Sequence, residues 1–294
     1  MQKRIIYGLC LLLLPFQHLL AQDSSLLKML NDSAGADHHR ELVIGTFKAT
    51  QLINVPTTES PARKNLQFLI MHRFGKINQG AYELFGLDNA EIRFGLDYGI
   101  TDRFSVGIGR SSYNKAFDGS LKYKLLQQYS SGMPVSVSLF GVVNNYTLRY
   151  TDKPYLNANY RTSYTSQVLI ARKFNRNLSF ELVPSWTHIN LTPTTADKND
   201  VFAMTVGGRM KFTKRMSIDA EYNYLFNNQV VSTKVYNALS LGLDIETGGH
   251  VFQLVFTNAQ AITGPYYLTQ TNGSWGKGDI FFGFNISRNF NFRK

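Results

Sequence analysis

Cysteine is almost missing from this chain. The single cysteine among 294 residues, Cys10, lies in an N-terminal stretch that has the form of an export signal. In that stretch Lys3 and Arg4 precede an apolar segment, and Ala21 is a plausible last residue before a cleavage site. The mature chain is therefore expected to contain no disulfide, no thiolate metal site and no cysteine nucleophile.

Long apolar runs and charge are also scarce. The alternative to a cleaved signal is an N-terminal membrane anchor, which the interruptions at Pro15, Gln17 and His18 disfavour. Beyond residue 21 no apolar run approaches the ~20 residues of a membrane helix. Charged residues make up only 17% of the chain and aromatic residues 13%. Together with many Gly, Asn, Ser and Tyr residues, this composition indicates one large all-β domain with many turns.

What the chain does contain is long alternation of apolar and polar residues. The clearest runs cover residues 91–100, 201–212, 216–227 and 237–246. Such strands exceed the ~5–6 residues usual in globular proteins and match the ~9–11 residues of a tilted membrane strand. Their polar faces carry charge, Gly and Ser, which suit the lumen of a membrane barrel better than the core of a soluble β-sandwich.

One turn chemistry occurs three times, over residues 100–106, 174–180 and 212–218. Each copy has an apolar residue, three polar residues, a second apolar residue, a serine and a third apolar residue. The apolar faces of the two strands agree only if the loop has three residues, because a slip of one residue would invert one strand. The predicted opposite pairs are Ile100 and Phe104, Phe174 and Leu178, and Phe212 and Met216.

These patterns predict an all-β transmembrane antiparallel up-and-down β-barrel of about 12 strands, with ten or fourteen as alternatives. The expected strands cover 66–74, 91–100, 104–112, 117–125, 135–147, 161–174, 178–190, 201–212, 216–227, 237–246, 250–258 and 278–290. The short turns then follow even-numbered strands, which puts them and both chain ends in the periplasm. Four long loops, 75–90, 151–159, 192–200 and 259–277, are expected outside; their Tyr, Asn and Trp residues suit carbohydrate but are also ordinary loop composition.

The N-terminal part does not fit this strand parity. We expect residues 45–54 to lie outside the barrel wall, either plugging the lumen or adding to a sheet edge, and residues 24–31 to form a short helix. The predicted parts are a signal peptide over 1–21, an N-terminal periplasmic or plug segment over 22–65 and an outer-membrane β-barrel over 66–294.

Several short motifs carry a resemblance to a known family. They are residues 47–54 (FKATQLIN), 72–75 (HRFG), 85–88 (FGLD), 95–103 (GLDYGITDR) and 107–111 (GIGRS). The chain resembles a family of uncharacterised β-barrel proteins, a domain of unknown function, from Gram-negative outer membranes. The resemblance implies fold and location and supplies no catalytic residues. The aromatic-rich last strand also resembles the assembly signal of outer-membrane proteins, although Arg293 and Lys294 follow its last aromatic residue.

The formal net charge of +11 does not indicate a nucleic-acid partner in an exported barrel. On the expected inward faces of the clearest strands, seven acidic residues stand against five basic ones, so the basic excess lies mostly in loops and turns. The three-residue turn places Arg209 opposite Asp219, with Lys211 and Glu221 diagonal to them. The candidate lumen charge ladder is Arg93, Asp97, Lys122, Lys124, Arg209, Lys211, Asp219 and Glu221. It serves either as salt-bridged packing of a narrow lumen or as a pore lining that sets selectivity.

No catalytic, cofactor or metal site is predicted. His38 and His39 are adjacent and point apart in an extended segment. Trp186, His188 and Asn190 share a strand face, but no serine partner can be nominated from spacing.

We therefore expect a non-enzymatic outer-membrane barrel of a Gram-negative bacterium that acts as a small or plugged channel for small solutes. The alternatives are a structural or ligand-binding barrel without a through-pore and, less favoured, a membrane-embedded lipid-modifying enzyme. The expected partners are outer-membrane lipid, the barrel-assembly machinery and a small solute.

Overall fold

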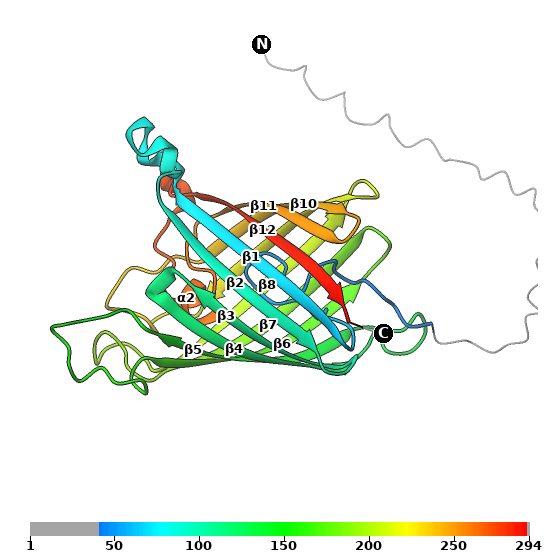
Figure 1. Ribbon diagram of the computed structural model, residues 1–294, viewed down its shortest axis with the longest axis horizontal. Coiled ribbons are helices and arrows are strands. Elements are labelled where there is room, and N and C mark those ends of the chain that lie inside the picture. The colour runs from blue at the N-terminus through cyan, green and yellow to red at the C-terminus, as the bar shows by residue number, and fades with distance from the viewer. Residues whose placement is uncertain (1–40, 293–294) are drawn as a thin grey trace, which may run out of the picture. The chain divides into compact units, whose positions relative to one another are not determined.

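A computed structural model describes residues 41–292, which form a closed barrel of twelve antiparallel strands (Figure 1). Each strand pairs with its neighbours in sequence, and β1 pairs with β12 to close the barrel. The strands are β1 (Asn65–Lys76), β2 (Ala90–Gly99), β3 (Phe104–Ser111), β4 (Ala116–Leu126), β5 (Ser136–Tyr146), β6 (Thr162–Lys173), β7 (Leu178–Ile189), β8 (Asp200–Lys211), β9 (Met216–Leu225), β10 (Ala238–Thr247), β11 (His250–Thr257) and β12 (Phe281–Asn291). The predicted signal peptide, the helix at 24–31 and the pair His38–His39 lie outside the described residues.

The predicted strand count and up-and-down topology are confirmed, and ten or fourteen strands are excluded. The largest boundary error is at β12, which begins at residue 281 and not at 278. Residues before it form the short 3-10 helix η4 (Trp275–Lys277). Gly278 follows with a φ of 74°, a left-handed conformation that glycine adopts without strain and that a strand does not contain.

The three repeated turns have the predicted register. In each turn the apolar residue before the loop donates its backbone N–H to the carbonyl of the apolar residue after it, with N···O distances of 3.0, 3.0 and 3.2 Å for the turns at 100, 174 and 212. The first loop residue in each copy, Thr101, Asn175 or Thr213, accepts a hydrogen bond at 2.9 Å from the backbone N–H three positions later. This cap explains why a short polar residue opens each loop.

The two faces of the wall have opposite polarity to those of a soluble barrel. Outward apolar side chains such as Phe94, Ile108 and Phe202 are 45%, 64% and 51% exposed, whereas the inward serines that follow the repeated turns are buried. Exposed apolar rings around the whole wall are stable only where the surrounding solvent is itself apolar. None of the helices among residues 41–292 is long and apolar enough to cross a membrane.

The N-terminal segment fills part of the lumen and is not a wall strand. Residues 46–59, called the plug below, are mostly buried inside the barrel. The segment enters where Val43 donates its backbone N–H to Gln128 at 2.9 Å and leaves where Lys64 donates to Gly99 at 2.8 Å. Both contacts lie at the end of the barrel with the repeated turns, called the short-turn end. The plug is therefore a loop that enters the lumen and leaves it again at the same end of the barrel (Figure 1, blue).

A second segment enters from the opposite, long-loop end. The connection between β11 and β12 was expected to be an exposed loop over 259–277, but residues 259–272 fold into the barrel, with the helix α2 (Gly264–Thr269) at their centre. The expectation was wrong because this connection carries a run of apolar residues that pack against inward wall residues. The packed clusters include Ala259, Tyr267 and Leu268 with Ala203 and Ala238, and Ile262 with Leu69 and Met71.

Candidate functional site

Glu221 of β9 holds the tip of the plug. Its Oε2 accepts hydrogen bonds from the backbone N–H groups of Ile53, Asn54 and Val55 at 3.2, 2.9 and 3.1 Å. Its Oε1 accepts from the side-chain amide of Asn54 at 2.9 Å. Successive N–H groups that converge on one carboxylate form a built anion site, here occupied by the protein's own wall.

Lys122 of β4 binds the same segment through its carbonyls. Its Nζ donates to the backbone oxygens of Thr50, Thr57 and Glu59 at 3.3, 2.9 and 2.8 Å. An ammonium has three donors and no acceptor, so all of its hydrogen-bonding capacity is used. The wall thus offers a carboxylate to the plug's N–H donors and an ammonium to its carbonyl acceptors.

Further polar side chains of the wall complete this docking. Arg73 donates to the Asn54 amide oxygen at 3.0 Å. Asn285 donates to the Ile53 carbonyl at 3.0 Å, and Gln253 donates to the Leu52 carbonyl at 2.6 Å. These contacts come from the adjacent strands β1, β12 and β11, whereas Lys122 lies on β4, so the plug is held from two sides of the barrel.

Part of the lumen wall is apolar where the plug covers it. The plug residues Phe47, Leu52 and Val55 form a buried cluster with three inward wall residues, Leu169, Ala171 and Val183. A water-filled pore favours polar lining, whereas this contact has the composition of a protein core.

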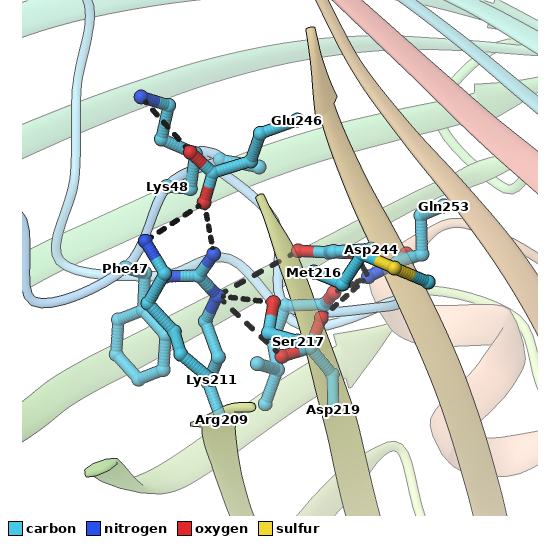
Figure 2. A network of polar contacts seen from close by, with 12 residues as sticks. Phe47, Lys48, Arg209, Lys211, Met216, Ser217, Asp219, Asp244, Glu246 and Gln253 are labelled. Atoms are coloured by element: carbon cyan, nitrogen blue, oxygen red, sulfur yellow. Dashed lines mark hydrogen bonds and ion pairs between the residues drawn. The ribbon is translucent and has the colours of Figure 1, made fainter. Parts of the chain in front are cut away.

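A second polar network surrounds Arg209 of β8 (Figure 2). Its guanidinium donates to Ser217 Oγ at 2.9 Å and to Glu246 Oε1 at 2.5 Å. It also lies 3.8 and 3.7 Å from carboxylate oxygens of Asp219 and Asp244. One arginine therefore faces three carboxylates from two adjacent strands, β9 and β10.

Glu246 links this network to the plug's entry. It forms ion pairs at 3.4 Å with Lys211 of the wall and with Lys48 of the N-terminal segment (Figure 2). Asp219 and Asp244 share the Gln253 amide, at 3.0 and 2.7 Å, and Gln253 also binds the plug. The two networks are thus one connected system.

The eight residues of the predicted charge ladder do not form one ladder. Arg209 is opposite Asp219 in register, but its shortest carboxylate contact and that of Lys211 are both to Glu246, while Glu221 turns to the plug. Glu246 was not predicted as a partner because it lies on β10, which is separated from Arg209 and Lys211 on β8 by β9.

The remaining ladder residues lie on β2 and β4. Arg93 forms a two-bond ion pair with Asp118 at 2.9 and 2.5 Å, and Asp118 was not among the predicted residues. Asp97 lines a cavity of about 50 Å³ between the plug and α2. Lys124 lies near the short-turn end beside the start of the plug. A cavity of this size has room for a few water molecules only.

A large cavity lies at the long-loop end, and we call it the vestibule. Its volume is about 660 Å³. It is lined by residues of η3 (Tyr113–Lys115), of α2 and of the three connections 147–161, 190–199 and 226–237. Six tyrosines contribute to the lining: Tyr113, Tyr146, Tyr150, Tyr155, Tyr160 and Tyr266. Loop composition singled out Tyr155 and Tyr266 but could not bring them together, since the loops meet only in the folded barrel.

His188 lies at the long-loop end of β7, on the outward face of the wall. Its Nδ1 is 2.9 Å from Asp200 Oδ1, which also accepts from Trp186 Nε1 at 3.0 Å. Asp200 was not predicted as its partner. Among the described contacts of His188 there is no serine or threonine hydroxyl.

Comparison with known families decides the class of this barrel. Residues 47–290 match the family model described as "Membrane bound beta barrel domain (DUF5777)". The chain belongs to this family. Its described fold, a closed membrane-bound β-barrel, agrees with that description, and the resemblance expected from the motifs is confirmed. No curated protein matches the chain.

Solved barrels give distant matches. The NanC porin is similar with 9% identity and a TM-score of 0.48, over 77% of this chain and 100% of that one. The KdgM porin has 8% identity and a TM-score of 0.44, over 78% of this chain and 99% of that one. LpxR from Salmonella typhimurium has 9% identity and a TM-score of 0.38, over 78% of this chain and 100% of that one.

Proposed function

We propose that this protein is an outer-membrane β-barrel without a through-pore, that it is not an enzyme, and that it acts by binding a ligand at its long-loop end. The observation that carries the proposal is the plug. It is held by side chains from several strands and shares an apolar core with the wall. Membrane lipid around the outward face and the barrel-assembly machinery are the proposed partners.

The plug's apolar core is the main argument against an open channel. Burying a side chain such as Phe47 or Leu52 contributes ~1.5–3 kcal/mol relative to exposure. Withdrawal would wet both these residues and the inward Leu169, Ala171 and Val183. It would also leave Glu221 and Lys122 without the backbone partners that satisfy them. The buried apolar contacts and the hydrogen bonds of Glu221 and Lys122 both favour the closed state.

A plugged channel is the second candidate, because one observation favours it. The plug enters and leaves at the short-turn end, so it could withdraw as a loop without threading through the barrel. Apart from the apolar residues that the plug and the 259–272 segment cover, much of the lumen wall is polar or charged. A barrel with the plug withdrawn would then conduct small solutes.

A covalent lock on the plug separates the two candidates. The Leu52 side chain occupies the space beside Gly207 of β8 where a Cβ would lie, so we choose these two neighbouring positions for an engineered disulfide. Cys10 in the predicted signal is the chain's only natural cysteine, so no natural cysteine is expected in the exported protein to compete for the engineered disulfide. The test is planar-bilayer conductance of the purified full-length protein, with L52C/G207C and each single cysteine variant as controls.

The closed barrel predicts no conductance steps from the wild type and none from the L52C/G207C variant, oxidised or reduced. Steps in the wild type that disappear in the oxidised double variant and return with reductant would replace this proposal with the plugged channel.

The proposal that the protein is not an enzyme is supported by the surroundings of His188. The His188–Asp200 pair could orient a base, but covalent acyl transfer from lipid to the protein also needs a nucleophilic side chain within hydrogen-bond reach of the imidazole. We expect purified protein to hydrolyse no phospholipid or glycolipid. Hydrolysis that is lost in His188→Ala and kept in the neighbouring variant Tyr164→Phe would contradict this.

A further inference from the structure

The vestibule has the size and position of a ligand site. Its volume of about 660 Å³ lies within the range of ~300–1,000 Å³ typical of small-molecule pockets. It sits on top of α2, which closes the lumen below it, so a ligand would reach it from the long-loop end and stop there. Tyr150, Tyr155 and Tyr160 on the rim are 37%, 58% and 40% exposed.

The vestibule is positively charged. Four cations line it, Lys153, Arg161, Lys198 and Lys234, and none of them forms an ion pair with a carboxylate of the described chain. The three lysines come from three different connections, so their charges are spread around the cavity. Unpaired cations that line a concave surface raise the local concentration of anions.

The one acidic lining residue does not cancel this charge locally. Asp197 is buried, and its carboxylate accepts hydrogen bonds from the backbone of Val231 and Ser232 at 2.7 and 2.9 Å and from Thr194 Oγ1 at 2.9 Å. Its oxygens are therefore directed at the loops that it joins and not at the cavity's lysines.

A buried hydroxyl in the floor of the vestibule has no partner. Tyr266 of α2 is 5% exposed, and its OH group makes no hydrogen bond within the described chain. A hydroxyl that is buried without a partner is unfavourable. The Tyr266 ring packs against Tyr113, with 5.7 Å between ring centroids, directly beneath the cavity that both rings line.

The pattern of charges and rings indicates the ligand class. A ligand with clustered phosphates favours arginines that bind with two parallel bonds. Here the only arginine, Arg161, donates instead to the carbonyls of Leu156 and Leu148 at 3.0 and 2.5 Å. What remains is separated lysine point charges, tyrosine rings at the rim, of which Tyr150 carries the Lys153 ammonium over one face at 4.9 Å, and amides such as Gln270 and Asn272. Separated charge, flat apolar faces and many hydrogen-bonding groups match a chain of sugars with one acidic group per unit.

We propose that the vestibule binds an acidic oligosaccharide. The sugar faces pack on the rings of Tyr150, Tyr155 and Tyr160, and the ligand's carboxylates or sulfates pair with Lys153, Lys198 and Lys234. This inference deepens the proposed ligand-binding function and rests on it.

Calorimetric titration of the full-length protein in a neutral detergent tests this inference. The two probes are a short linear oligouronate and the same oligosaccharide after its carboxyl groups have been reduced to alcohols. We expect the oligouronate to bind at least tenfold more tightly, with an affinity that falls as salt is added. The variant K153Q/K198Q/K234Q should lose at least tenfold in affinity for the oligouronate, and Y150S/Y155S should weaken the binding of both probes.

The matched control is R176Q/K214Q/R215Q, which removes the same charge from turns at the short-turn end. It should bind like the wild type. Equal affinity for the two probes, or full affinity in K153Q/K198Q/K234Q, would overturn the inference. Competition by an acidic glycolipid in nanodiscs, absent with neutral phospholipid, would identify a lipid headgroup as the source of the sugar. Conductance of the same preparation tests the closed barrel separately, because a silent barrel that binds neither probe refutes only the ligand assignment.

Discussion

At the scale of single residues, two charged side chains of this barrel act on backbone groups. Glu221 and Lys122 saturate the donors and acceptors of one irregular segment, a role that helices and sheets normally fill for themselves. An irregular segment buried in a lumen needs such partners because its own peptide groups have no ladder.

Glu221→Gln tests this role. A glutamine has the same shape but one neutral acceptor oxygen, and its amide nitrogen would meet donors around Asn54. We expect the amides of Ile53, Asn54 and Val55 to exchange with solvent ten- to a hundredfold faster, since hydrogen bonds to a charged acceptor contribute ~1.5–3 kcal/mol. Mass-spectrometric hydrogen exchange measures this. Glu91→Gln, on β2 away from the plug, is the control and should leave these amides unchanged.

Asp197 gives a pH-dependent prediction at the vestibule rim. Burial alone would raise the pKa of this carboxyl, but hydrogen bonds from Ser232, Val231 and Thr194 outweigh it and hold the pKa well below its usual value. A lowered folded pKa contributes stability that is present above the unfolded pKa of ~3.9 and is lost as pH falls through the folded value. Exchange protection of the 226–237 connection should therefore stay constant from pH 7 to about 5 and fall in stronger acid.

Asp197→Asn is the matching variant. It should weaken protection of the same connection at pH 7, roughly fivefold for the loss of charge from one hydrogen-bond acceptor, and remove the acid-dependent step. An acid-dependent step that persists in this variant would assign it to another group.

At the scale of elements, the repeated turn is stabilised by a side chain as well as by its length. Thr101→Val and Thr213→Val keep the shape of the residue and remove the oxygen that caps the turn. We expect each to lower the free energy of unfolding in detergent by ~0.5–1.5 kcal/mol, the net value of one hydrogen bond. Lys214→Ala changes the loop that contains Thr213 but leaves the capping oxygen in place, and it should have no measurable effect. Equal losses in all three variants would mean that the cap is not the stabilising contact.

The elements also show what local sequence can predict. All twelve strands were found from period-two alternation and turn chemistry, because wall strands pair with their sequence neighbours everywhere except where β1 pairs with β12. Strand parity excluded residues 45–54 from the wall but left plugging the lumen and adding to a sheet edge as alternatives. The insertion of residues 259–272 and the meeting of six tyrosines in the vestibule were not predicted, since they depend on contacts between loops distant in sequence. The run of apolar residues within 259–272 was the one local signal that could have revealed this insertion.

At the scale of the whole molecule, the lumen is a folding core of mixed character. The barrel's usual apolar surface faces outward, so the interior must be stabilised by the plug's apolar cluster together with charged and polar contacts. Net stabilisation by buried charges requires every partner to be present, because a single unpaired charge is more costly than an apolar replacement. The plug and the wall are thus expected to unfold together.

This dependence predicts that one double variant changes the midpoint of thermal unfolding differently in the presence and in the absence of the plug. In the full-length protein, the double variant E221Q/K122M should lower the midpoint of thermal unfolding, because the plug loses contacts at both its N–H and carbonyl groups. With residues 46–59 replaced by a short Gly/Ser linker, the two charges have lost those partners. There the same substitutions should change the midpoint little, since water that enters the emptied lumen hydrates both charges. Circular dichroism melts of the four proteins measure both effects. A similar decrease in the midpoint with and without the plug would mean that Glu221 and Lys122 stabilise the wall itself and that the plug does not contribute to their effect.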